Sequence, residues 1–148
     1  MSGALDHSPA DIVAQLLVDL SLGSDPTGSS AWPVFVAREP ETPDNCITVF
    51  GTASKKQGRT MNDGEVQEQH GIQVSVRSGT YPTGFAKARA IAVALDESVR
   101  LNTVSLESAT YTVYGVSRTS GPLDLGKEPT TKRNVFTINA TVTLRQSS

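Results

Sequence analysis

YPTGFAKARAIAVALDESVR, residues 81–100, is the stretch on which the predicted fold depends. Its apolar residues recur at spacings of three and four, which places them on one face of an α-helix. The stripe consists of Ala88, Ile91, Ala92, Leu95 and Val99. Alanine has the highest intrinsic helix propensity, and its small side chain lets a helix approach a sheet closely. We therefore predict a helix packed on a sheet built from both halves of the chain, with Lys87 and Arg89 on its exposed side.

A second helix is predicted near the N-terminus, over residues 9–22. Ser8 is a typical N-cap residue, Pro9 suits the first helical position, and Asp11 complements the helix dipole. Gly23 is suited to end the helix. Its polar face lacks the lysine and arginine of a membrane-surface helix, so we expect it to pack on the same sheet.

Alternation of apolar and polar residues, β-branched and aromatic content, and flanking turn residues predict five strands and one further short strand. They span residues 32–37, 46–50, 65–78, 110–120 and 133–145, with the short strand at 103–106. Residues 51–64 are expected to form the projecting loop of a hairpin, and residues 121–132 a second loop. The order α-β-β-β-α-(β)-β-β indicates an α+β fold, with a mixed, mainly antiparallel sheet and two helices packed on one face.

Two of these strands indicate which of their faces is buried. In the strand over 65–78, one face carries Ile72, Val74 and Val76, and the other carries Gln73, Ser75 and Arg77. We expect the first face in the core and the second in water. The last strand should offer Phe136, Ile138, Val142 and Leu144 to the core.

Length and composition indicate one domain without an overall basic charge. The chain has 148 residues, which suits one compact domain, and residues 1–7 are expected to form a flexible tail. Hydrophobic residues make up 37% of the chain, and its mean hydropathy is -0.21. These low values favour a subunit of an assembly that is held against partners. A net charge of -2 argues against nucleic-acid binding as the main task.

The single cysteine and the lack of a recognisable signal peptide indicate a protein made in a reducing cytosol. The single cysteine, Cys46, cannot form an intrachain disulfide, which disfavours a disulfide-framed secreted protein. The first residues lack the basic region of a signal peptide, and no apolar run approaches the ~18 residues of a membrane span. We expect no membrane partner.

Residues 121–128, GPLDLGKE, have the G-x-x-x-x-G-K spacing of a phosphate-binding loop. Glu128 stands where that loop needs a hydroxyl for magnesium, and Asp124 would place a negative charge beside the phosphates. Pro129 does not open the helix whose N-terminus should face the phosphates. We therefore expect no nucleotide and no other cofactor.

No other motif predicts catalysis. Cys46 and His70 could face each other on neighbouring strands, but a third group and an oxyanion site cannot be identified. His7 is expected in the flexible tail, and two histidines and one cysteine offer no metal-ligand spacing. We predict that the protein is not an enzyme, with no catalytic, cofactor-binding or metal-binding residues.

The loop over residues 51–64 carries three cations, Lys55, Lys56 and Arg59. Because no aromatic residues are interleaved with them, they are a weak footprint for nucleic-acid recognition. A solvated tip or a protein contact is the favoured interpretation.

Several segments, taken in their order and spacing, resemble tail terminator and minor capsid (tail completion) proteins of long-tailed bacteriophages. They are PADIVAQLL, PDNCITVFGT, HGIQVSVRSG, FAKARAIAVALDE and the ending YTVYGVSRTSGPLDLGKEPTTKRNVFTINATVTL. The resemblance covers residues 8–144. Its most characteristic part is the ending, in which GPLDLGKEP leads into RNVFTINATV.

The resemblance implies a structural virion protein, made in the host cytoplasm. It would form a ring of six subunits on the head-proximal end of the tail tube, stop tube polymerisation and provide the head-attachment surface. Its partners would be other copies of itself, the tail tube protein and a connector or stopper protein, with DNA only passing through the lumen. We expect interface residues at Lys55, Lys56, Arg59, Asp124, Lys127, Lys132 and Arg133. A head completion or stopper protein, or a small host binding module, are the alternatives.

Overall fold

The structure is a computed structural model that describes residues 7–24, 32–38, 44–59, 66–99, 101–119, 121–127 and 133–147. It contains two helices, α1 (Pro9–Asp19) and α2 (Tyr81–Glu97). Its strands are β1 (Val34–Val36), β2 (Cys46–Arg59), β3 (Val66–Ser78), β4 (Asn102–Leu106), β5 (Ala109–Arg118), β6 (Leu123–Lys127) and β7 (Asn134–Ser147). Residues 1–6 of the expected tail lie outside the described ranges.

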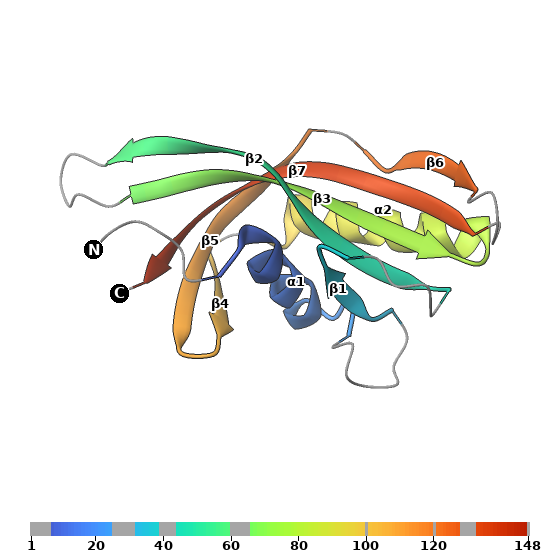
Figure 1. Cartoon of the computed structure of the whole chain (residues 1–148), viewed down its shortest axis with the longest axis horizontal. Coiled ribbons are helices and arrows are strands. Elements are labelled where there is room, and N and C mark those ends of the chain that lie inside the picture. The colour runs from blue at the N-terminus through green and yellow to red at the C-terminus, as the bar shows by residue number, and fades with distance from the viewer. Residues whose placement is uncertain are drawn as a thin grey trace.

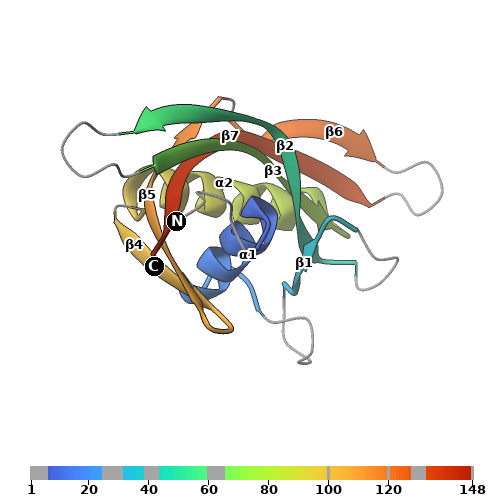
Figure 2. The same cartoon turned by 60° about the vertical axis from the view of Figure 1, so that its left-hand side comes forward.

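One mixed sheet contains all seven strands, in the order β1-β2-β3-β7-β5-β4, with β6 also paired to β7. Only β1 is parallel to its neighbour, and the other pairs are antiparallel. The sheet curves over α1 and α2, which both lie on its inner side (Figure 1, Figure 2). The predicted α+β class, mainly antiparallel sheet and one-sided helices are confirmed.

Helix α2 packs on the sheet as its sequence predicts. All five residues of the predicted apolar stripe are buried, although the helix ends at Glu97 and Val99 lies just after it. The helix also has a close contact that the stripe did not reveal, at Gly84. A Cβ there would lie 2.8 Å from Cε2 of Phe136 and 3.0 Å from Cβ of Ser78. The first turn of α2 therefore approaches the sheet at a distance that only glycine allows.

Helix α1 begins where predicted and ends earlier. The Ser8 side chain accepts a hydrogen bond from the Asp11 amide, which confirms the N-cap. The helix ends at Asp19, and the left-handed residue after it is Ser21 (φ 63°), so Gly23 is not the stop. Instead, a Cβ on Gly23 would lie 2.2 Å from Cγ2 of Val34. Gly23 lets the chain pass close to β1.

The hairpin between β2 and β3 has longer strands than predicted. Residues 51–59 were expected in the loop, but they continue β2 as far as Arg59, which pairs with Val66. Strands β2 and β3 form the upper left end of the sheet, where β3 still pairs with β7 at Glu68 and Gln69 (Figure 1). Residues 51–59 are mostly polar, so the apolar alternation that signals a strand is missing, although the backbone ladder continues.

A further strand, β6, lies in the expected loop over residues 121–132. It pairs with the first half of β7, from Leu123 opposite Thr137 to Lys127 opposite Asn134. Strand β5 pairs with the second half of β7, so β5 and β6 share one edge of it. Most of the segment that resembles a phosphate-binding loop is therefore a strand in the sheet and not a loop.

The outer face of β3 is more buried than predicted. The core faces of β3 and β7 are confirmed, because Ile72, Val76 and Phe136 are all buried. However, Ser75 and Arg77, expected in water, are buried as well, and Arg77 is 2% exposed. Alternation along β3 distinguishes its two faces, but it does not report what lies over the outer one.

Candidate assembly surfaces

The projecting hairpin carries the three predicted basic residues on β2. Lys55 lies opposite Gln69, Lys56 opposite Glu68 and Arg59 opposite Val66. Strand β1 pairs only with residues 47–49 of β2, so among the described residues the outer edge of β2 has no strand partner from residue 50 onward. The hairpin thus has an outer backbone edge on the strand whose sequence includes the three basic residues.

The other predicted interface residues lie at the opposite end of the sheet (Figure 1). Asp124 pairs with Phe136 and Lys127 with Asn134, where β6 meets the start of β7. Lys132 lies outside the described residues. The two clusters predicted from the sequence are therefore not brought together into one site.

Arg133 is held within the subunit. Its side chain is only 9% exposed, and its Nη1 lies 3.4 Å from Oδ1 of Asp44. The backbone carbonyl of the same Asp44 accepts a hydrogen bond from Nε of Arg77. Asp44 thus links the start of β2 to β3 and to the segment leading into β7, and Arg133 can position that end of the sheet.

A ridge of exposed side chains runs along α2, and sequence reasoning missed it. Among the described residues, three of the four large exposed hydrophobic residues lie on this helix: Tyr81 (48% exposed), Phe85 (41%) and Val93 (39%). Together with the exposed Arg89 they occur every fourth residue and form what we call the α2 ridge. Tyr81 and Phe85 stack on each other and meet the ring of Phe136 edge-on. Their spacing was the available signal.

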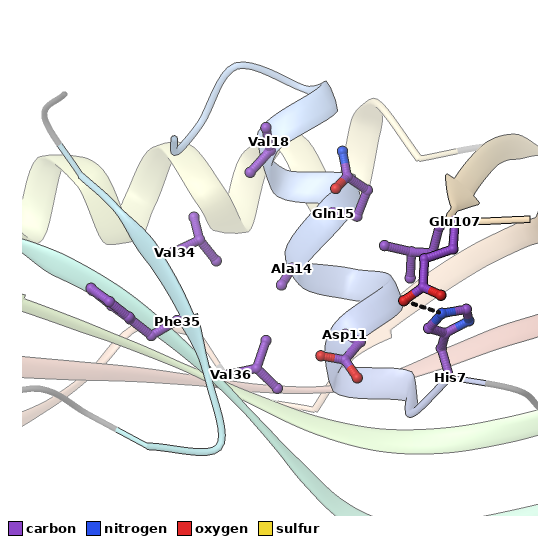
Figure 3. A pocket seen from close by; sticks show the side chains of 10 residues that line it. His7, Asp11, Ala14, Gln15, Val18, Val34, Phe35, Val36 and Glu107 are labelled. Atoms are coloured by element: carbon purple, nitrogen blue, oxygen red, sulfur yellow. Dashed lines mark ion pairs between the residues drawn. The ribbon is translucent and has the colours of Figure 1, made fainter. Parts of the chain in front are cut away.

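A groove of about 430 Å³ lies along the side of α1 that faces away from α2, between β1 and the β4–β5 turn (Figure 3). We call it the α1 groove. It is lined by Asp11, Ala14, Gln15 and Val18 of α1, Val34, Phe35 and Val36 of β1, and His7, Leu106 and Glu107. Val34 and Val36 point toward α1, and the carboxyl groups of Asp11 and Glu107 lie at the other end (Figure 3). Most of its lining residues are apolar, with Gln15 of α1 among them, and one end is acidic.

His7 closes the acidic end of the groove. It was expected in a flexible tail, but its Nδ1 is hydrogen-bonded to the Tyr111 hydroxyl and its ring packs edge-on against Tyr111. Its Nε2 lies 3.7 Å from Oε1 of Glu107. The residue that precedes Ser8 and α1 is thereby attached to the β4–β5 hairpin.

Comparison with known protein families assigns the chain to one of them. The family model described as "Bacteriophage tail terminator protein" matches residues 15–145. The chain belongs to the bacteriophage tail terminator family. The match begins within α1, includes α2 and strands β1 to β6, and ends near the end of β7, so the resemblance seen in the sequence is confirmed.

Other comparisons are more distant. The chain is similar to one in a solved structure titled "Virion of native gene transfer agent (GTA) particle", with 14% identity and a TM-score of 0.43. That similarity covers 76% of this chain and 78% of the other. No curated protein sequence matches the chain significantly.

As a member of this family, the tail terminator is a structural, tail-related protein of the phage virion. The family is not one of enzymes. Among the described residues, no three His, Cys, Asp or Glu side chains gather as a metal site. In that part of the chain no helix is long and apolar enough to cross a membrane.

The possible thiol site of the tail terminator is not formed. Cys46 pairs with Arg77, whereas His70 pairs with Ser54. His70 and Arg77 are seven residues apart on β3, which corresponds to about 23 Å of strand. The idea that Cys46 and His70 face each other was wrong, because it depended on a register that the apolar pattern does not specify.

Proposed function

We propose that this tail terminator forms a ring, of six subunits, that caps the head-proximal end of the tail tube. The ring would stop tube polymerisation and present the surface to which the head attaches. The observation that carries this proposal is the family match over residues 15–145. DNA would pass through the lumen of the ring without being a specific ligand.

The arrangement of the sheet supports such a cap. A cap needs one surface for the tube and another for the connector. The basic hairpin with Lys55, Lys56 and Arg59 lies at one end of the sheet, and the β6–β7 end with Asp124 and Lys127 lies at the other. We assign the hairpin to the contact with the tube, and the β6–β7 end, with Lys132 and Arg133, to contacts between subunits or with the connector.

Charge reversal at the hairpin tests this assignment. The variant Lys55→Glu, Lys56→Glu, Arg59→Glu should lower the yield of completed tails by about tenfold or more. The reason is that like charges placed opposite each other across an interface cost several kcal/mol. Tails would be counted by electron microscopy in a complementation assay. The isolated protein should keep its melting temperature, since these residues lie on the part of β2 whose outer edge has no strand partner among the described residues.

The matched control exchanges the same positions without changing charge, as Lys55→Arg, Lys56→Arg, Arg59→Lys. This control should give normal tails. Normal tails from the reversed variant would exclude the hairpin as a contact. Separately, a pull-down should retain tail tube protein rather than the portal complex, and retention of the portal complex alone would favour a head completion or stopper role.

A further inference from the structure

We infer that the α2 ridge of one subunit docks into the α1 groove of the next copy of the same chain. This inference rests on the proposed ring. A ring is built from heterologous contacts, in which one surface of each subunit meets a different surface of its neighbour. The subunit must therefore present two unlike, complementary surfaces that cannot meet within one chain.

The α2 ridge has the composition of an interface. Exposed aromatic residues and arginine are enriched at protein–protein contacts, and a monomer gains nothing by exposing them together. Tyr81, Phe85 and Val93 are each exposed by more than a third, with Arg89 between them. The stacking of Tyr81 on Phe85 holds the two rings in place before any partner arrives.

The α1 groove has the complementary composition. Ala14, Val18 and Val36 give it apolar sides, and its volume of about 430 Å³ admits aromatic side chains. Asp11 and Glu107 supply carboxylates at one end, and the Glu107 side chain is 85% exposed. An arginine set in an apolar ridge matches a groove with apolar sides and an acidic end.

The two surfaces face away from each other. Lys87 donates a hydrogen bond to the Leu22 carbonyl, so the flank of α2 that bears Lys87 faces the chain leaving α1. The ridge lies on another flank, where Phe85 meets Phe136 of β7. The groove lies on the side of α1 away from α2, between β1 and the β4–β5 turn (Figure 3). Contact between ridge and groove therefore requires a second copy and continues from subunit to subunit.

Thiol cross-linking tests the contact directly. In the variant with both Phe85→Cys and Gln15→Cys, a short bis-maleimide should link successive subunits into a ladder of products on a denaturing gel. Each single variant alone should give no ladder, and an equal mixture of the two single variants should give dimers only. Cys46 is fully buried and serves as an internal control.

A charge exchange gives a second readout. Arg89→Glu and Glu107→Arg should each weaken assembly about tenfold in sedimentation experiments, and the double variant should recover most of that loss. Thr83→Glu is the matched control, because it adds a glutamate to an exposed site on α2 that is not part of the ridge. It should leave assembly unchanged.

The outcomes separate this contact from the ring itself. A wild-type chain that stays monomeric, alone and with tail tube protein, contradicts the proposed function and the contact with it. An oligomer that forms without the ladder, and that ignores Arg89→Glu, contradicts the contact alone. Cross-linking of the Phe85→Cys variant to added tube protein in place of a second copy also overturns the inference.

Discussion

Lys87 differs most from what its position in the sequence suggested. It was expected on the exposed side of α2, but its Nζ donates a 2.9 Å hydrogen bond to the Leu22 carbonyl and lies 5.3 Å from the ring centroid of Trp32. Burial lowers the pKa of its ammonium group. One side chain therefore ties α2 to the segments on either side of the gap between α1 and β1.

Lys87→Ala is therefore expected to lower the free energy of unfolding by about 1 kcal/mol, through loss of a charge-assisted hydrogen bond and a cation–π contact. Arg89→Ala, two residues along the same helix, should change it by less than about 0.5 kcal/mol. Urea unfolding of both variants, followed by Trp32 fluorescence, measures the difference. Equal stability of the two variants would contradict this role.

At the scale of elements, the end of α2 is clamped to the end of β5. Nε and Nη2 of Arg118 donate hydrogen bonds of 2.9 and 2.6 Å to the two oxygens of Asp96. The hydrogen bonds from Arg118 lower the pKa of the Asp96 carboxyl, and they raise the pKa of Arg118. The bidentate geometry fixes the direction in which α2 leaves the sheet.

The clamp makes a pH-dependent contribution to stability. Because the folded pKa of Asp96 lies below its unfolded value, the contribution is complete above the unfolded pKa of about 3.9 and is lost as pH falls through the folded pKa. Asp96→Asn should cost less than about 1 kcal/mol at pH 7, since the pair is partly exposed. Urea titrations should show that this deficit shrinks below about pH 4.

The neighbouring variant Glu97→Gln removes an exposed charge one residue away and serves as the control. Its free energy of unfolding should follow that of the wild type closely from pH 7 to pH 3. A deficit of Asp96→Asn that stays constant from pH 7 to pH 3 would show that the clamp does not act through the charge of its carboxylate.

The whole molecule is organised around one core that both helices share. Strand β3 lies between β2 and β7 in the sheet, with α1 packed mainly towards β1 and β2, and α2 towards β7 and β5. The core cluster contains residues from both helices and all of these strands. Neither half of the chain can bury its apolar face without the other.

We therefore expect the subunit to unfold in a single cooperative step. Trp32 packs against this core, near α1 and β1, whereas the far-ultraviolet signal reports all helices and strands. The thermal transitions measured by Trp32 fluorescence and by circular dichroism should coincide. Two separated midpoints in dilute, monomeric protein would show that the chain contains two independently folding units.

Local chemistry in the sequence determined the two helices, most of the strands and the core-facing sides of β3 and β7. The stripe from Ala88 to Val99, the Ser8 cap and the alternation around Val74 depend on neighbours within one helix or strand, and periodicity reports which of those side chains avoid water. The order of the segments was also enough for the family resemblance, because that order is a property of the chain itself.

Only the tertiary structure decided where the surfaces lie. The burial of Arg77, the distance between Cys46 and His70, and the placing of Lys55 and Lys127 at opposite ends of the sheet all follow from strand register. Register and layer packing join residues far apart in sequence, and one-dimensional periodicity carries no information about such pairs. The spacing of the α2 ridge residues can be read in the sequence, but their exposure and the α1 groove are seen only in the folded chain.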